Sequence, residues 1–158
     1  MLRSLSKTIA PGIAWAVAAS FALSFGAASA GELNPAAISI TLPKDIKWID
    51  NTAAGSRQAV LVGDPSKPGL YIVLNQWTPH HMSHPHFHVN DRYITVLSGT
   101  WWVGTGTKWD PEMTTPIPAG SYVRHVGKEI HWDGAKDETV TLEIVGMGPA
   151  TSIPADQK

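Results

Sequence analysis

The sequence predicts a single all-β domain, and three observations lead to that fold class. The chain has 158 residues, of which 43% are hydrophobic and 16% charged, a size and balance typical of one folded domain. Its 14 glycines and 12 prolines indicate many turns. Short runs rich in β-branched and aromatic residues recur between these turn residues, and no window has a sustained helical period. We therefore expect a β-sandwich or β-barrel.

The first predicted strands lie between residues 38 and 77. Ile38–Leu42 alternates large apolar residues with small polar ones, which is typical of a strand with one buried face. Gln58–Val62 and Leu70–Trp77 are apolar runs rich in valine, isoleucine and aromatic residues. The polar, proline-bearing segment Gly63–Gly69 between them is a predicted loop.

The remaining predicted strands follow the same two patterns. A Ser-Gly pair predicts a hairpin turn between Arg92–Leu97 and Thr100–Val103. Lys108–Pro118 is polar and proline-bearing and is a predicted loop. Ser121–Val126 and Thr139–Val145 alternate apolar with polar residues and complete the set.

Residues 1–30 have the layout of a secretory signal peptide. Arg3 and Lys7 give a positive start, an apolar stretch follows, and Ala28 and Ala30 supply the small residues of a cleavage site. A membrane anchor is the alternative, but proline, glycine and serine interrupt the stretch and no stop-transfer run follows. We expect a mature domain of residues 31–158 that is periplasmic or secreted and has no membrane contact after cleavage.

Composition and motifs exclude several function classes. The formal net charge is −1 and no basic patch with interleaved aromatic residues occurs, so a nucleic-acid partner is not expected. The absence of cysteine excludes disulfides, thiolate metal sites and cysteine nucleophiles. No nucleophile elbow, phosphate loop or paired-carboxylate motif is present.

The histidines are concentrated in one part of the chain. All seven lie between His80 and His131, and five fall within His80–His88. Because side chains alternate along a strand, His86 and His88 point the same way and can chelate one ion, with His131 as the third ligand. Neutral imidazoles suit Zn, Cu, Fe, Ni and Mn. A solvated loop whose histidines have no function is the alternative.

At this cluster the sequence resembles the cupin superfamily, in particular small exported single-domain cupins. His86, His88 and Gly99 reproduce the spacing of the first cupin motif, and Pro118–Ser121 with Val126–His131 resembles the looser second motif. The resemblance runs roughly from Ile38 to Pro149. It implies a jelly-roll β-barrel that holds one divalent metal ion on His86, His88 and His131. It also implies that the protein pairs as a homodimer.

The sequence departs from the cupin pattern at the carboxylate ligand. Arg92 occupies the usual position of that glutamate, and Tyr93 occupies the alternative position. Arg92 has the parity of Ile94 and Val96, which we expect to face the barrel interior. An arginine beside a dication is costly to bury unless an anion lies between them, so we expect Arg92 to receive an anionic group of the substrate. The alternative is that Arg92 reaches solvent or pairs with Asp91.

Arg92, Tyr93 and Asp133 are the candidate catalytic residues. Asp133 is placed either to orient a ligand imidazole or accept a proton, or to serve only as a turn residue. His125 is either a fourth ligand or a histidine with no role in the site. Glu143 is either the missing carboxylate or part of a solvated face, since its parity is opposite to that of its apolar neighbours.

Two main function classes follow from these residues. The first is a metalloenzyme with one divalent ion (Fe, Mn, Zn, Cu or Ni) that acts on a small anionic organic molecule by dioxygenase-type or isomerase- or lyase-type chemistry. The second is a non-catalytic periplasmic copper- or zinc-binding protein, because His80, His81, Met82 and His84 lie outside the triad and soft methionine beside imidazole suits copper. A non-catalytic barrel that binds a small ligand is a third class.

Overall fold

The computed structural model describes residues 31–158. The predicted signal peptide therefore lies outside the described residues. Residues Ile40–Lys158 form one compact unit, which the predicted domain 31–158 contains. Within the described part of the chain, no helix has the length and apolar character needed to cross a membrane.

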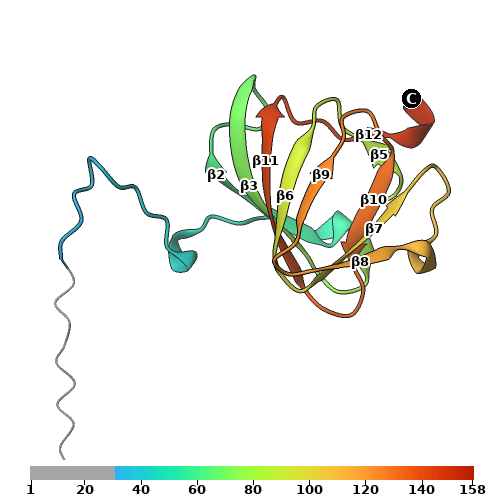
Figure 1. Cartoon of the computed structure of the whole chain (residues 1–158), viewed down its shortest axis with the longest axis horizontal. Coiled ribbons are helices and arrows are strands. Elements are labelled where there is room, and N and C mark those ends of the chain that lie inside the picture. Colours follow the sequence, from blue (N-terminus) through green and yellow to red (C-terminus); the bar gives the residue numbers. More distant parts are fainter. Residues whose placement is uncertain (1–30) are drawn as a thin grey trace, which may run out of the picture. The chain divides into compact units, whose positions relative to one another are not determined.

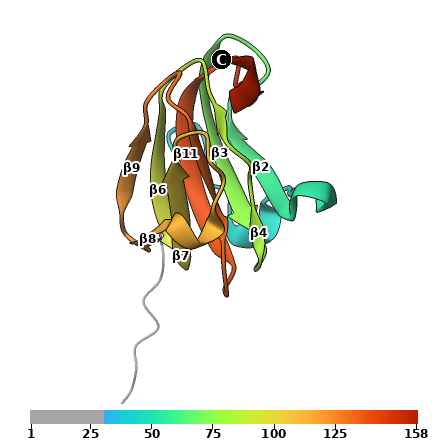
Figure 2. The ribbon, with the colours of Figure 1, turned by 90° about the vertical axis from the view of Figure 1, so that its right-hand side faces the viewer.

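Two antiparallel sheets make up the compact unit, and Figures 1 and 2 show them as two facing layers. The first sheet has the strand order β1-β2-β3-β11-β6-β9. Its strands are β1 (Ile49–Asn51), β2 (Ser56–Val62), β3 (Gly69–Trp77), β6 (Arg92–Ser98), β9 (Tyr122–His125) and β11 (Val140–Gly148).

The second sheet has the order β12-β5-β10-β7-β8, and β4 pairs with β10 beside this path. Short 3-10 turns η1 to η4 connect or flank the strands. The strands are β4 (His81–Met82), β5 (His86–Phe87), β7 (Thr100–Thr105), β8 (Thr115–Pro118), β10 (His131–Ala135) and β12 (Ile153–Pro154), and the turns are Pro43–Asp45, Thr52–Ala54, Pro111–Met113 and Ala155–Gln157. The prediction of an all-β fold is confirmed.

The hydrophobic core lies between the two sheets. On β6 and β11, Ile94, Val96 and Leu142 are no more than 1% exposed, and Trp101 of β7 packs against them from the other sheet. Strand alternation puts Arg92 on the same inward face as Ile94 and Val96. The prediction that Arg92, Ile94 and Val96 face the barrel interior is therefore correct. This alternation along β6 places Arg92 inside the barrel.

Two predicted elements are wrong. Ile38–Leu42 forms no strand, and its large apolar side chains are exposed. The edge beside β2 is occupied instead by β1, which pairs with β2 from Ile49 to Asn51. The predicted loop Lys108–Pro118 contains strand β8, whose prolines are tolerated because β8 is the outer strand of its sheet.

Candidate metal centre

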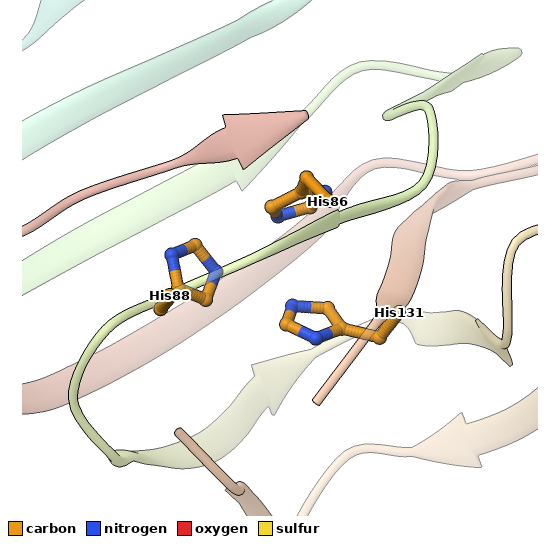
Figure 3. A group of neighbouring side chains, drawn as sticks. All are labelled: His86, His88 and His131. Atoms are coloured by element: carbon orange, nitrogen blue, oxygen red, sulfur yellow. The ribbon is translucent and has the colours of Figure 1, made fainter. Parts of the chain in front are cut away.

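Three histidines from two paired strands form a compact cluster inside the barrel. His86 lies on β5 and pairs directly with His131 at the start of β10, while His88 follows β5. One ring nitrogen from each residue lies within 4.8 Å of the others. Figure 3 shows the three rings turned toward a common point. The structure therefore brings together the three residues that the sequence offered as metal ligands.

Backbone carbonyls orient all three rings in the same way. A carbonyl oxygen accepts hydrogen bonds but cannot donate them, so the Nδ1 atom facing it must carry the proton. This leaves the Nε2 lone pair free, and in His88 and His131 the buried Nε2 has no hydrogen-bond partner. The Nδ1 partners are the carbonyl of His84 for His86 (2.9 Å), that of Thr151 for His88, and that of Glu129 for His131 (3.1 Å).

Burial keeps the buried ligand candidates uncharged. Desolvation, together with the nearby Arg92 guanidinium, lowers the pKa of His88 to about 2. Desolvation also lowers the pKa of His131 to about 4, against the opposing effect of the Asp133 carboxylate. Both imidazoles are thus neutral at neutral pH, which is the protonation state that a metal ion requires.

His125 is a fourth buried histidine, and its hydrogen bond gives it the opposite tautomer. Its ring centroid is 3.8 Å from that of His131. The Arg92 Nη2 group lies 3.2 Å from His125 Nδ1, and because a guanidinium only donates, Nδ1 must accept. The proton of neutral His125 is therefore on Nε2. Of the two groups that could hold an ion, His125 with His131 and Asp133 is less suited than His86, His88 and His131.

The Arg92 side chain lies inside the barrel and not in solvent. Asp91, its predicted alternative partner, accepts hydrogen bonds from Arg124 Nε at 2.9 Å and from the Gly127 N–H at 2.7 Å. Arg92 Nε is buried without a partner. Burial lowers the pKa of Arg92, and the Asp133 carboxylate opposes that effect. Arg92 is therefore a buried cation with an unused hydrogen-bond donor.

The other acidic and phenolic candidates divide between the two faces of the sheets. Asp133 is buried and accepts a hydrogen bond from Trp101 Nε1 at 3.2 Å, so it lies inside the barrel. Tyr93 is 42% exposed and alternates away from Arg92, which corrects the prediction that it is a catalytic residue. Glu143 occupies the outward-facing parity of β11 and cannot supply the missing carboxylate ligand.

A cavity of about 400 Å³ opens at the histidine cluster. His86, His88, Arg92 and Asp133 lie in its wall, and Ile94 is among its apolar lining residues. Its volume falls in the range of sites that bind small molecules. A metal ion on the triad would face this cavity together with the guanidinium of Arg92.

Solved structures share this architecture. The polyketide cyclase RemF from Streptomyces resistomycificus has 17% sequence identity to this chain, with a match that covers 75% of this chain and 85% of the cyclase at a TM-score of 0.62. A cupin-2 domain from Rhodospirillum rubrum has 13% identity, coverage of 72% and 76%, and a TM-score of 0.54. The protein has the cupin fold. KdgF from Halomonas sp. has 14% identity, coverage of 70% and 94%, and a TM-score of 0.54.

These matches confirm the predicted cupin jelly roll at the level of the fold. No protein-family model and no curated protein sequence matches the chain.

The remaining histidines line a different cavity, of about 680 Å³. His80, His81, Met82 and His84 all border it, but His81 Nδ1 lies 2.8 Å from the Pro79 carbonyl, and the His84 ring contacts Trp109 in a tilted arrangement. Within residues 31–158, none of these histidines belongs to a group of three His, Cys, Asp or Glu ligand atoms within 4.8 Å. The second histidine group is therefore not a preformed imidazole site.

Sequence reasoning did not find the role of His125 or the carbonyls that orient the triad. His125 pairs with Arg92 across β6 and β9. Had the pairing of these two strands been predicted, the inward position of Arg92 would have placed His125 inside the barrel as well. The Thr151 carbonyl lies far from His88 in the sequence, and no local pattern indicates that contact.

Proposed function

We propose that this protein is a mononuclear metalloenzyme that transforms a small organic anion. His86, His88 and His131 hold the ion through Nε2, and Arg92 binds the anionic group of the substrate. A divalent ion at this position supplies Lewis-acid activation and a template for the substrate. Dioxygenase-type and isomerase- or lyase-type chemistry both fit a three-histidine site, and the identity of the metal decides between them.

The arrangement of the Nδ1 atoms carries the metal assignment. All three triad rings direct Nδ1 at a backbone carbonyl, which leaves three Nε2 lone pairs for one ion. A cluster of three buried or half-buried imidazoles with unused lone pairs is costly without a partner. A divalent ion satisfies all three at once.

The charge balance inside the barrel supports an anionic substrate. A divalent ion on neutral histidines keeps its full charge, and Arg92 adds another positive charge. Among the described residues, Asp133 is the one acidic side chain that is buried, and its single negative charge offsets only part of that positive charge. A carboxylate or oxyanion that reaches the unpartnered Nε of Arg92 would neutralise much of the remainder.

Metal stoichiometry tests the metal assignment. We expect about one tightly held ion per chain in the purified protein, and loss of that ion in His86→Ala/His88→Ala. His80→Ala/His81→Ala/His84→Ala is the matched control, because these histidines lie outside the triad. Retention of the ion in this control supports the enzyme. Its loss there, with retention in the triad variant, would support a metal carrier instead.

Arg92→Met tests the anion assignment. The variant keeps the volume of the side chain but removes its charge and its donors, so small carboxylates should bind at least about tenfold more weakly while the ion stays bound. Isothermal titration with acetate and with longer carboxylates measures this change. Unchanged carboxylate affinity would refute the role of Arg92.

We also propose that the enzyme works in the periplasm or outside the cell. The charge, length and terminal small residues of the segment 1–30 support this location. Fractionation of cells that express the full chain tests it, with the N-terminal residue of the mature protein determined by mass spectrometry.

A further inference from the structure

The cavity at the histidine cluster has a second wall made of neutral polar side chains. Asn51, Ser56, Gln58 and Asn75, here called the polar threshold, line this cavity. The same four residues also line a cavity of about 280 Å³ at the edge formed by β1 and β2. The two cavities therefore adjoin across the polar threshold, and the space available to a ligand continues beyond the metal centre.

Asn75 is a half-buried polar side chain among core residues on the inner face of β3. The inward positions of β3 are Tyr71, Val73, Asn75 and Trp77, and the other three are buried core residues. Gln58 stands directly opposite Asn75 on β2. Among the hydrogen bonds of the described residues, the side chains of Gln58 and Asn75 take part in none, whereas the outward neighbour Gln76 bonds to Arg57 and Thr141.

A buried indole adds a further unused donor. Trp77 is 8% exposed and lines the same cavity, and its Nε1 has no hydrogen-bond partner. Buried donors are normally satisfied, so the unpaired indole N–H of Trp77 indicates a polar ligand, and the amides of half-buried Asn75 and exposed Gln58 line the same cavity. An amide offers a donor and an acceptor close together, which is the combination that binds a hydroxyl group.

The register of the strands sets the length of such a ligand. Arg92 pairs with Gly146 on β11, and Gly146 pairs with Tyr71 on β3. Asn75 lies four residues beyond Tyr71, about 13 Å along the strand at 3.3 Å per residue, and β3 lies two strands from β6, about 10 Å across the sheet. A ligand that reaches both Arg92 and the polar threshold must therefore be an extended chain and not a short acid.

We infer that the substrate is a polyhydroxylated carboxylate. Its carboxylate lies at Arg92, and its hydroxyl groups lie on Gln58, Asn75 and the Trp77 N–H. The position of the carboxylate rests on the proposed function, whereas the positions of the hydroxyl groups rest on the polar threshold and Trp77. The apolar floor beneath the chain is formed by Ile94, Leu142 and Ile144.

Binding of matched carboxylates to the purified protein tests this inference. Gluconate and hexanoate have the same carbon chain with and without hydroxyl groups, and sorbitol has the hydroxyl groups without the carboxylate. We expect gluconate to bind at least about tenfold more tightly than hexanoate in isothermal titration or ligand-observed NMR, because two or more hydrogen bonds are gained. Sorbitol should bind more weakly than gluconate but should compete with it.

Variants assign the preference to the polar threshold. Gln58→Leu and Asn75→Leu should each reduce the ratio of gluconate to hexanoate affinity severalfold, and the double variant should remove most of the preference, leaving only the contribution of the Trp77 N–H. Gln76→Leu removes an amide from the outer face of the same strand and should leave the ratio unchanged. The melting temperature of each variant shows whether it is folded.

Two results would overturn the inference. One is equal affinity for gluconate and hexanoate, or no measurable binding of gluconate. The other is a preference for gluconate that is undiminished in the folded double variant. The metal content of the same samples separates this failure from failure of the proposed function, since a protein with one triad-bound ion and no hydroxyl preference refutes the substrate class alone.

Discussion

At the scale of single residues, proton positions distinguish ligands from non-ligands. Nδ1 of His86, His88 and His131 faces a carbonyl oxygen, whereas Nδ1 of His125 faces the Arg92 guanidinium. Four neighbouring imidazoles thus have two different tautomers, and the chemistry of each hydrogen-bond partner fixes which one. This arrangement leaves three of them with a free Nε2 lone pair that could bind a metal ion, and the fourth with an Nε2–H donor.

The tautomer of His125 depends on Arg92. In the wild-type protein we expect the proton on Nε2, and in Arg92→Met we expect this preference to be lost because no donor holds Nδ1. Long-range proton–nitrogen NMR spectra of the imidazole rings measure the two tautomers. An Nδ1-protonated His125 in the wild-type protein would contradict the assignment.

At the scale of elements, a glycine fixes how closely β7 and β10 approach. Gly104 pairs with Trp132, and a Cβ atom at Gly104 would overlap the Trp132 indole ring. We expect Gly104→Ala to lower the free energy of unfolding by roughly 1–3 kcal/mol. Thr105→Ala, at the exposed neighbouring position, should change it by less than about 0.5 kcal/mol. Urea unfolding followed by tryptophan fluorescence measures both, and equal effects would refute the packing role of Gly104.

Asp91 links the start of β6 to the loop between β9 and β10. It binds Arg124 and the Gly127 N–H, and the next amide, that of Lys128, donates to the His88 carbonyl at 2.6 Å. The Gly127 hydrogen bond lowers the pKa of Asp91, and Arg124 lowers it further. This contact therefore connects β6, which carries Arg92, with the loop that contacts the backbone of the candidate ligand His88.

The stability that Asp91 supplies should depend on pH. Because its pKa is lower in the folded protein, the ionised carboxylate stabilises the fold above the unfolded-state pKa of about 4, and this contribution is lost as the pH falls through the lower folded-state value. Asp91→Asn should lower the melting temperature at pH 7, and its gap to the wild type should narrow below a pH of about 4. Glu143→Gln on the outer face is the control. A gap that stays constant over this range would contradict the prediction.

Alternation along strands explains which parts of the site could be predicted. The inward position of Arg92 followed from Ile94 and Val96 on the same strand, and the triad followed from the spacing of His86 and His88. The same alternation argues against Tyr93 as a catalytic residue, because Arg92 faces inward and the adjacent Tyr93 therefore faces outward. The contacts of His125 and Thr151 depend on pairing between distant segments, which a single sequence does not encode locally.

At the scale of the whole molecule, the cupin barrel depends on the pairing of distant strands. Ile38–Leu42 has a strand pattern in its sequence but no strand partner in the structure. Ile49–Asn51 is too short to be predicted as a strand from its sequence, yet it pairs with β2. A metal ion that joins His86 and His88 to His131 would connect strands far apart in the sequence. Because such an ion binds only the folded chain, it should stabilise that chain by mass action.

Metal removal should therefore lower the stability of the whole domain. At a free-ion concentration about 100 times the dissociation constant, binding contributes about 2.7 kcal/mol. We expect a chelator to lower the melting temperature of the wild type but not that of His86→Ala/His88→Ala, as measured by differential scanning calorimetry. An equal decrease in both proteins would place the stabilising ion elsewhere.

The most direct test of the three-histidine centre is a crystal structure of the metal-loaded protein with the ion located by anomalous scattering. We predict one ion bound at about 2.0–2.2 Å by Nε2 of His86, His88 and His131, with His125 not coordinated and Arg92 facing the open positions. An ion held by His125, His131 and Asp133, or the absence of an ion from the triad, would contradict the account.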